Sequence, residues 1–167
     1  ASGQPFCAIC CDSRKSFRRD LEPTYKAQRE AKPEPFYHQM RLALDTLKGD
    51  GFPIFAADGF EADDVIASAT NIALNIAVDG RSGIDFGDEV REVIGDEPLA
   101  ILIVSSDKDL LALVSQRVTV KSATSGNVLD KAGVVEKFGV APAQMRDYLS
   151  LVGDASDNVK GAKGIGA

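Results

Sequence analysis

Residues 99–109 of the chain read Leu99-Ala-Ile-Leu-Ile-Val104-Ser-Ser-Asp107-Lys-Asp109, an unbroken apolar run that is followed at once by two carboxylates. A continuous run of this kind is typical of a parallel strand that is buried on both faces. Two other predicted strands, 6–11 and 52–56, are also followed by acidic side chains, which are Asp12 after the first and Glu61, Asp63 and Asp64 after the second. Because ligands of open α/β sheets bind at the carboxyl ends of the strands, we expect these carboxylates to lie around one crevice.

Apolar residues between these strands recur with helical spacing. One face of the stretch 34–48 carries Phe36, Met40, Ala43, Leu44 and Leu47, and the predicted inward face of the stretch 61–78 carries Val65, Ala69, Ile72 and Ile76. Further helices are predicted over 109–114, 130–139 and 142–152, with a short strand over 118–121. Asp130 and Gly139 suit the two ends of the middle one, and Pro142 suits the first turn of the last. This alternation predicts an α/β layered fold with a mostly parallel central sheet flanked by helices.

The chain is expected to divide into a core, 1–140, and a C-terminal region, 141–167. Within the core, the stretch of about 13–33 has little hydrophobic periodicity and is predicted to be an exposed arm. The stretch 79–98 holds seven acidic residues against two arginines, and it is predicted to be a solvated acidic insert with a short helix near Val90.

The amino-acid composition limits the classes of protein to which the chain can belong. A chain of 167 residues with 44% hydrophobic residues is long enough to bury one sizeable core, and its longest apolar run is too short to span a bilayer. The three clustered cysteines, Cys7, Cys10 and Cys11, favour a reducing compartment and are predicted to be buried free thiols. The net charge of −6 is segregated, because residues 14–32 hold seven basic side chains against three acidic ones. A nucleic-acid partner therefore remains compatible with the sequence.

A fourth acidic cluster, Gly153-Asp154-Ala-Ser-Asp157-Asn158, would fold back over the predicted crevice. So many close carboxylates repel one another unless a cation neutralises them, and all-oxygen ligands without His or Cys suit Mg²⁺ or Mn²⁺. Two such ions can drive an in-line phosphoryl displacement. Helix capping and the helix dipole offer a structural explanation for each cluster alone. The arrival of all four clusters at one end of a sheet favours a metal site.

Two further segments have the composition of nucleic-acid contacts. Ser16-Phe17-Arg18-Arg19 and Tyr25-Lys26-Ala-Gln-Arg29 interleave aromatic and cationic side chains, which suits a single strand, although a solvated basic loop is the alternative. The turn Gly161-Ala-Lys163-Gly164-Ile-Gly166 would let backbone N–H groups approach a phosphate, with a flexible chain end as the alternative. The single histidine, His38, has no ligand partner nearby in sequence and is interpreted as incidental.

Taken together, these motifs resemble the 5′-nuclease family, which includes the 5′–3′ exonuclease domain of bacterial DNA polymerase I, phage 5′-exonucleases and flap endonucleases. Gly59-Phe-Glu61-Ala-Asp63-Asp64 resembles the family's Glu-Ala-Asp-Asp helix start, and Ser105-Ser-Asp107-Lys-Asp109 resembles its Asp-Lys-Asp motif. Leu151-Val-Gly153-Asp154-Ala-Ser-Asp157-Asn158, followed by Gly161 to Gly166, resembles its Gly-Asp-Ser-Asp-Asn stretch and helix–hairpin–helix. The resemblance implies a PIN-like layered fold and a fragment that lacks the N-terminal strand and the end of the helix–hairpin–helix.

The resemblance also implies roles for individual residues. Asp12, Glu61 and Asp63 would line a first metal site with Asp64 in support, and Asp107, Asp109, Asp154 and Asp157 would shape a second. Lys26 and Arg29 would be the catalytic cations of an arch or gateway. The implied DNA contacts are Phe17, Arg18, Tyr25, Lys26, Arg29, Gly161, Lys163, Gly164 and Gly166. The implied cofactors are two Mg²⁺ or Mn²⁺ ions, with K⁺ at the hairpin.

The implied activity is a metal-dependent 5′–3′ exonuclease and flap endonuclease that cuts DNA near 5′ single-strand/duplex junctions during primer removal and repair. The expected partners are DNA with 5′ ends or flaps and a polymerase domain in the parent chain, and the protein is expected to be monomeric and not membrane-bound. The expected location is the cytoplasm or nucleoid, with an organelle as the alternative if a targeting segment precedes the chain. Two alternative functions stay open: a catalytically impaired DNA-junction binding module and a PIN-like ribonuclease.

Overall fold

The computed structural model describes residues 6–79 and 99–166. The predicted acidic insert and its short helix near Val90 therefore lie almost entirely outside the described residues. The chain forms two compact units. Unit 1 consists of Ala1–Val65 and Ala155–Val159, and unit 2 consists of Ile66–Asp154 and Lys160–Ala167.

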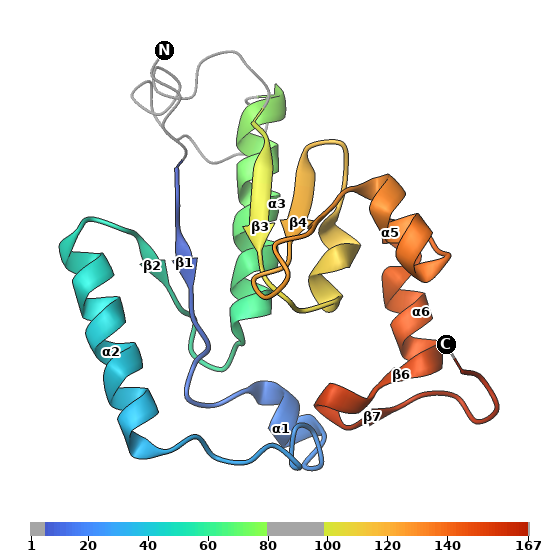
Figure 1. The fold of residues 1–167 in the computed structure, drawn as a ribbon, viewed down its shortest axis with the longest axis horizontal. Coiled ribbons are helices and arrows are strands. Elements are labelled where there is room, and N and C mark those ends of the chain that lie inside the picture. Colours follow the sequence, from blue (N-terminus) through green and yellow to red (C-terminus); the bar gives the residue numbers. More distant parts are fainter. Residues whose placement is uncertain (1–5, 80–98, 167) are drawn as a thin grey trace. The chain divides into compact units, whose positions relative to one another are not determined.

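Unit 1 contains a two-stranded parallel sheet and two helices. Strand β1 (Ile9–Cys10) pairs in parallel with β2 (Ile54–Phe55), and the connection between them carries α1 (Phe17–Leu21) and α2 (Glu34–Gly49). The strands lie side by side in Figure 1, with Ile9 opposite Ile54 and Cys10 opposite Phe55. The parallel pairing predicted from the sequence is confirmed.

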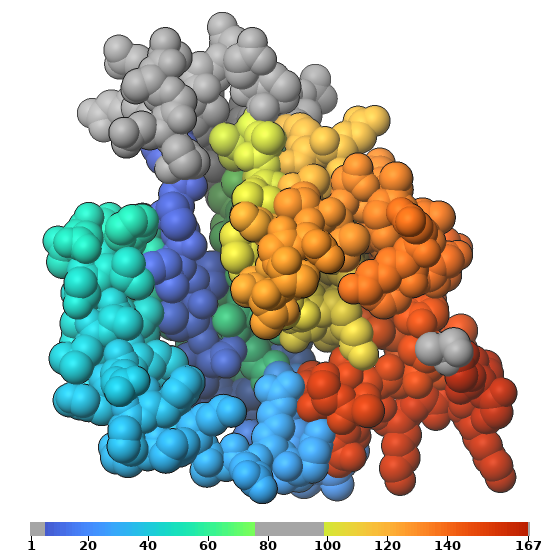
Figure 2. Space-filling model, viewed as in Figure 1, coloured from blue at the N-terminus to red at the C-terminus, as the bar shows by residue number. Residues whose placement is uncertain are grey.

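Helix α2 begins after Pro33 and ends at Gly49, close to the predicted bounds. Its apolar residues share a face as expected, but the helix buries none of its residues. Phe36 and Met40 are 45% and 46% exposed, and the α2 side chains stand open to solvent in Figure 2, where the helix is cyan. Helical periodicity thus identified the helix without showing how little of it is covered.

Unit 2 contains a three-stranded sheet. Strand β3 (Ile101–Val104) pairs in parallel with β4 (Val118–Lys121), which pairs antiparallel with β5 (Val128–Leu129). The predicted helix at 109–114 is a 3₁₀ helix, η1 (Asp109–Leu113). It is followed by α5 (Lys131–Phe138), the 3₁₀ turn η2 (Pro142–Gln144) and α6 (Met145–Val152). Beyond α6 lie β6 (Gly153–Asp154), η3 (Ala155–Asp157) and β7 (Val159–Lys160), so the predicted helix–hairpin–helix stays a prediction.

The buried core of unit 2 gathers side chains from the sheet, η1, α5 and α6. Its members are Ile103, Leu110, Leu111, Val114, Val118, Val120, Val134 and Met145. Strand β3 was expected to be buried on both faces, but Leu102 and Val104 are 54% and 60% exposed. Because successive strand side chains point to opposite faces, the core cluster covers only the face that carries Ile103.

Helix α3 (Ala62–Asp79) begins in unit 1 and continues in unit 2, where it lies beside β3 and β4 in Figure 1. Ile66 and Leu74 pack against the core of unit 2, and Thr70 between them is buried. Ile72, which was predicted to point inward, is 44% exposed. The buried stripe is therefore displaced from the predicted one, because helix α3 is apolar over more than one face and its periodicity alone does not choose between them.

The ends of α5 agree with the capping residues predicted from the sequence. The side chain of Asp130 accepts a hydrogen bond of 2.8 Å from the backbone N–H of Gly133. At the other end, Gly139 adopts the left-handed conformation with φ 73°, which costs glycine little. Pro142 begins η2, directly before α6. None of the described helices is both long and apolar enough to span a membrane.

The cysteines are free thiols, as predicted, but they are not fully buried. Cys7 is exposed because β1 begins only at Ile9, while Cys10 and Cys11 are half-buried. Burial raises the pKa of both half-buried thiols.

Candidate functional site

Several predicted carboxylates of unit 1 lie at the N-terminal turn of α3. Asp12, which follows β1, accepts a hydrogen bond of 2.7 Å from the backbone N–H of Ala62. The backbone N–H of Glu61 donates to Asp64 Oδ2 at 3.0 Å, and Asp63 is half-buried in the same turn. The positive end of the helix dipole favours carboxylates here, so the first turn of α3 gathers negative charge whether or not a metal is bound.

Arg18 pairs with Asp64. Its two terminal nitrogens lie 2.6 and 2.7 Å from the two oxygens of Asp64, and these hydrogen bonds hold the pKa of Asp64 below its usual range. Arg18 also lies over the Phe17 ring, which packs edge-to-face on Phe60. The structure thus places the predicted DNA contact Arg18 against a predicted metal-site carboxylate.

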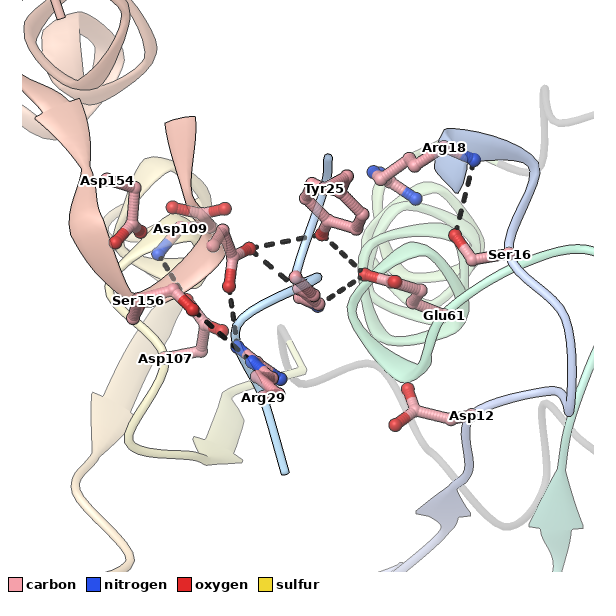
Figure 3. Close-up of polar contacts among 12 residues, drawn as sticks. Asp12, Ser16, Arg18, Tyr25, Arg29, Glu61, Asp107, Asp109, Asp154 and Ser156 are labelled. Atoms are coloured by element: carbon pink, nitrogen blue, oxygen red, sulfur yellow. Dashed lines mark hydrogen bonds and ion pairs between the residues drawn. The ribbon is translucent and has the colours of Figure 1, made fainter. Parts of the chain in front are cut away.

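Glu61 is held by two side chains of the basic segment. Glu61 Oε2 accepts hydrogen bonds from the Tyr25 hydroxyl at 2.9 Å and from Lys26 Nζ at 2.8 Å. Figure 3 shows Tyr25 and Glu61 directed toward each other. Burial raises the pKa of Glu61, but the hydrogen bonds from Lys26 and Tyr25 outweigh it and leave the pKa below its ordinary value.

Asp157 approaches the same two side chains within unit 1. Its Oδ2 lies 3.1 Å from the Tyr25 hydroxyl and 3.7 Å from Lys26 Nζ. Its Oδ1 accepts a hydrogen bond of 2.5 Å from Arg29 Nη2. Tyr25, Lys26 and Arg29 therefore surround one predicted metal-site carboxylate, and Tyr25 and Lys26 also contact a second.

The segment that carries these cations is exposed over most of its length, as predicted, but it is anchored at Tyr25. Tyr25 is only 9% exposed. Asn158 donates from Nδ2 to the backbone carbonyl of Thr24, and Gln28 donates to the carbonyls of Ala155 and Ser156. The low hydrophobic periodicity agrees with this exposure, and polar contacts, rather than an apolar face, hold the segment in place.

Unit 2 holds three more of the predicted metal ligands. The backbone N–H of Asp109 donates to Asp107 Oδ1 at 3.0 Å, and Lys108 Nζ lies 3.1 Å from Asp154 Oδ1. Carboxylate oxygens of Asp109 and Asp154 approach within 4.8 Å. Carboxylate oxygens are the ligands that a small hard cation such as Mg²⁺ prefers. The convergence of this set with the carboxylates of unit 1 stays a prediction.

The glycine-rich turn begins with a close backbone approach. A Cβ atom at Gly161 would overlap the backbone of Val152 and Leu151, and the N–H of Ala162 donates to the Leu151 carbonyl at 2.7 Å. Gly164 has φ 84°, and Lys163 and Gly166 are exposed. The first glycine is thus required by packing against α6, which the spacing of glycines alone did not show.

Three residues of the site were not singled out from the sequence. The backbone carbonyl of Ser156 accepts hydrogen bonds from the side chains of Gln28 and Arg29, and Lys108 neutralises Asp154. Lys108 lies within the Asp-Lys-Asp motif, so its spacing could have indicated it. The contacts of Gln28 and Ser156 join positions 128 residues apart, and no local pattern reports such a contact.

Comparisons with known proteins agree with this arrangement. Residues 2–81 match the family described as 5′-3′ exonuclease, N-terminal resolvase-like domain. The chain is 36% identical over 152 residues to the 5′-3′ exonuclease of Aquifex aeolicus, covering 91% of the chain and 45% of that protein. It is also 36% identical over 154 residues to the DNA polymerase I of Rhizobium leguminosarum, covering 92% of the chain and 13% of the polymerase.

Among solved structures, the chain resembles the flap endonuclease of bacteriophage T5, crystallised as a pseudo-enzyme-product complex with DNA and metal ions. The TM-score is 0.62 at 25% identity, and the match covers 93% of the chain and 54% of the phage protein. The chain therefore belongs to the 5′-nuclease family. It spans about half of the length of the phage and Aquifex proteins and a smaller share of the polymerase.

Proposed function

We propose that the chain is the metal-dependent part of a 5′–3′ exonuclease and flap endonuclease that hydrolyses DNA phosphodiesters near 5′ single-strand/duplex junctions, in primer removal and repair. The observation that carries this proposal is the contact of Glu61 with Tyr25 and Lys26. It joins a predicted metal ligand to side chains suited to DNA. The metal-bound DNA complex of the T5 relative supports the same chemistry.

The donor sets fit Mg²⁺ or Mn²⁺, because they consist of carboxylate oxygens without thiolate or imidazole. Asp12, Glu61 and Asp63 would hold an ion in unit 1, and Asp107, Asp109 and Asp154 would hold one in unit 2. Such ions, when bound, activate water and neutralise charge that develops on a phosphate. Asp64, with both oxygens paired to Arg18, would support the first site.

The remaining side chains would bind and orient DNA. Lys26 and Arg29 are cations that can contact the phosphate, and Phe17 and Tyr25 offer rings on which bases can stack. The Gly161–Gly166 turn would grip a duplex backbone and hold K⁺ as the start of a helix–hairpin–helix. We further propose a monomer in the cytoplasm or nucleoid, joined in its parent protein to a polymerase domain.

The test is cleavage of a 5′-labelled flap DNA with Mg²⁺ or Mn²⁺, with chelated metal as the control. The chain is compared with a version extended upstream by a strand that ends in Asp, because the family resemblance implies such a strand. Metal-dependent cutting near the junction by either version supports the proposal. An RNA flap in parallel distinguishes a PIN-like ribonuclease.

A non-catalytic DNA-junction binding module is the second candidate. It is favoured by one observation, which is that Arg18 and Lys26 pair with the carboxylates of Asp64 and Glu61. Junction binding that does not need metal, together with no cleavage by either version, would establish this alternative.

A further inference from the structure

We propose that Lys26 is an internal counter-ion that takes the place of a divalent cation at Glu61, and that metal binding displaces it and frees its ammonium group for DNA phosphate. The inference rests on the proposed metal site of unit 1. It adds a role for Lys26 before DNA arrives, which is to neutralise the carboxylate of Glu61.

The position of the Lys26 ammonium group is that of a bridging cation. Its Nζ lies 2.8 Å from Glu61 and 3.7 Å from Asp157. The side chains of Lys26 and Glu61 are each 12% exposed, and that of Asp157 is 9% exposed. Two carboxylates withdrawn from water in this way repel each other strongly, and each needs a cation to stay charged. Arg29 pairs with Asp157, and Lys26 is the cation that pairs with Glu61.

Tyr25 cannot replace that cation. Its hydroxyl lies within hydrogen-bond distance of both Glu61 and Asp157, but it carries a single proton and can donate to only one of them at a time. It also brings no positive charge. Lys26 supplies the additional donors and the neutralising charge, because an ammonium group has three N–H bonds.

The backbone also holds Lys26 in this position. Lys26 has φ 55°, a left-handed conformation that is uncommon for residues other than glycine. Its backbone N–H donates to the carbonyl of Asp157 at 3.0 Å. Lys26 is therefore anchored from both its main chain and its side chain, unlike a surface lysine that samples many rotamers.

A divalent ion at Glu61 must compete with this ammonium group. Both cations need the same carboxylate oxygens, and two cations at one carboxylate repel each other. Displacement costs Lys26 its ion pair with Glu61 but leaves its backbone anchor to Asp157 intact. The flexible four-carbon side chain can then carry the ammonium group to a phosphate while its Cα stays in place.

The experiment measures the accessibility of the Lys26 amine directly. The chain is acetylated briefly with an N-hydroxysuccinimide ester, with and without saturating Mg²⁺, and each lysine is quantified by peptide mass spectrometry. Lys48, which is exposed on α2, is the matched control. Because the Lys26 side chain is 12% exposed, release into solvent should raise its labelling about fivefold to tenfold, while Lys48 stays unchanged.

A variant separates the counter-ion role from a general effect of metal. Glu61→Gln removes the main anchor of the ammonium group, so Lys26 should be labelled rapidly even without metal. Circular dichroism confirms that this variant is folded. Slow labelling of Lys26 in the folded variant would contradict the counter-ion role.

Calorimetric titration with Mg²⁺ distinguishes a failure of the proposed displacement from a failure of the proposed metal site. If the chain binds Mg²⁺ and Lys26 labelling does not rise, the displacement is wrong and the proposed nuclease function stands. If no Mg²⁺ binds, both the displacement and the proposed metal site of unit 1 are wrong. Binding together with a selective rise at Lys26 supports the proposal.

Discussion

The guanidinium group of Arg18 forms a bidentate ion pair with the carboxylate of Asp64, with Nη1 2.6 Å from Oδ2 and Nη2 2.7 Å from Oδ1. The same Oδ2 accepts a hydrogen bond from the backbone N–H of Glu61. A two-bond pair of this kind fixes direction as well as distance. Arg18 therefore orients Asp64 and, through it, the first turn of α3 that carries Glu61.

Replacing Arg18 by Met should lower the free energy of unfolding by about 1–2 kcal/mol, because it removes two charge-assisted hydrogen bonds from a pair that water still partly screens. The measurement is urea denaturation. Arg19→Met, in the same helix, is the control, since Arg19 makes no ion pair within the described residues. Equal losses in both variants would contradict a specific role for Arg18.

The contribution of this ion pair should depend on pH in a defined direction. Hydrogen bonds from Arg18 lower the pKa of Asp64 in the folded chain, so the pair stabilises the fold above the unfolded carboxyl pKa of about 3.9. That stability is lost as the pH falls further, through the folded pKa. The difference in unfolding free energy between the parent and Arg18→Met should therefore shrink from pH 6 to pH 3. A difference that grows over this interval would show the assignment to be wrong.

Asp107→Asn should reduce flap cleavage more than about 100-fold, because it removes a carboxylate of the proposed metal site while nearly preserving shape. DNA binding, measured by fluorescence anisotropy, should change little. Asp147→Asn, on the exposed side of α6, is the matched control and should cleave normally. Equal cleavage rates for Asp107→Asn and the parent would contradict the proposed role of Asp107 as a metal ligand.

Met145→Ala should destabilise the chain by about 2–4 kcal/mol, because it leaves a cavity in the core of unit 2. Met145 is fully buried, whereas Leu151 on the same helix is 47% exposed. Leu151→Ala should therefore cost less than about 1 kcal/mol. Thermal unfolding of the two variants in parallel measures this contrast, and a reversed order would place the core elsewhere.

Gly161→Ala should destabilise the chain by about 2 kcal/mol or more, since its new Cβ would overlap the backbone at the end of α6. Gly166→Ala is the control, because nothing lies within 4 Å of a Cβ there. If the turn grips duplex DNA, only Gly161→Ala should also weaken duplex binding at a temperature where both variants are folded. Similar unfolding free energies for the two variants would show that the approach to α6 is not tight.

Local signals predicted much of the fold. Capping at Asp130 and Gly139 located α5 correctly, and the apolar run that ends at Val104 located β3. The burial of each face was harder to predict. An apolar helix such as α3 offers several candidate stripes, and only the packing of unit 2 selects Ile66 and Leu74 over Ile72.

The candidate site was likewise predicted only in part from the sequence. Charge patterning identified Lys26 and Arg29 as functional candidates, but it gave no sign that Lys26 would contact a carboxylate rather than solvent. Sequence reasoning treats cations as available for a ligand. A folded chain first pairs them with its own carboxylates, because a charge withdrawn from water needs a partner.

Unit 1 is discontinuous in sequence, since it combines residues up to Val65 with the short segment Ala155–Val159. A ribosome synthesises the chain from its N-terminus, so unit 1 is begun first but is completed only after most of unit 2 has been made. Until Asp157 emerges, the 24–29 segment lacks the partner that Tyr25, Lys26 and Arg29 share. The basic segment should therefore reach its final arrangement only after nearly the whole of unit 2 has been translated, which delays assembly of the Glu61 site until the core of unit 2 is available.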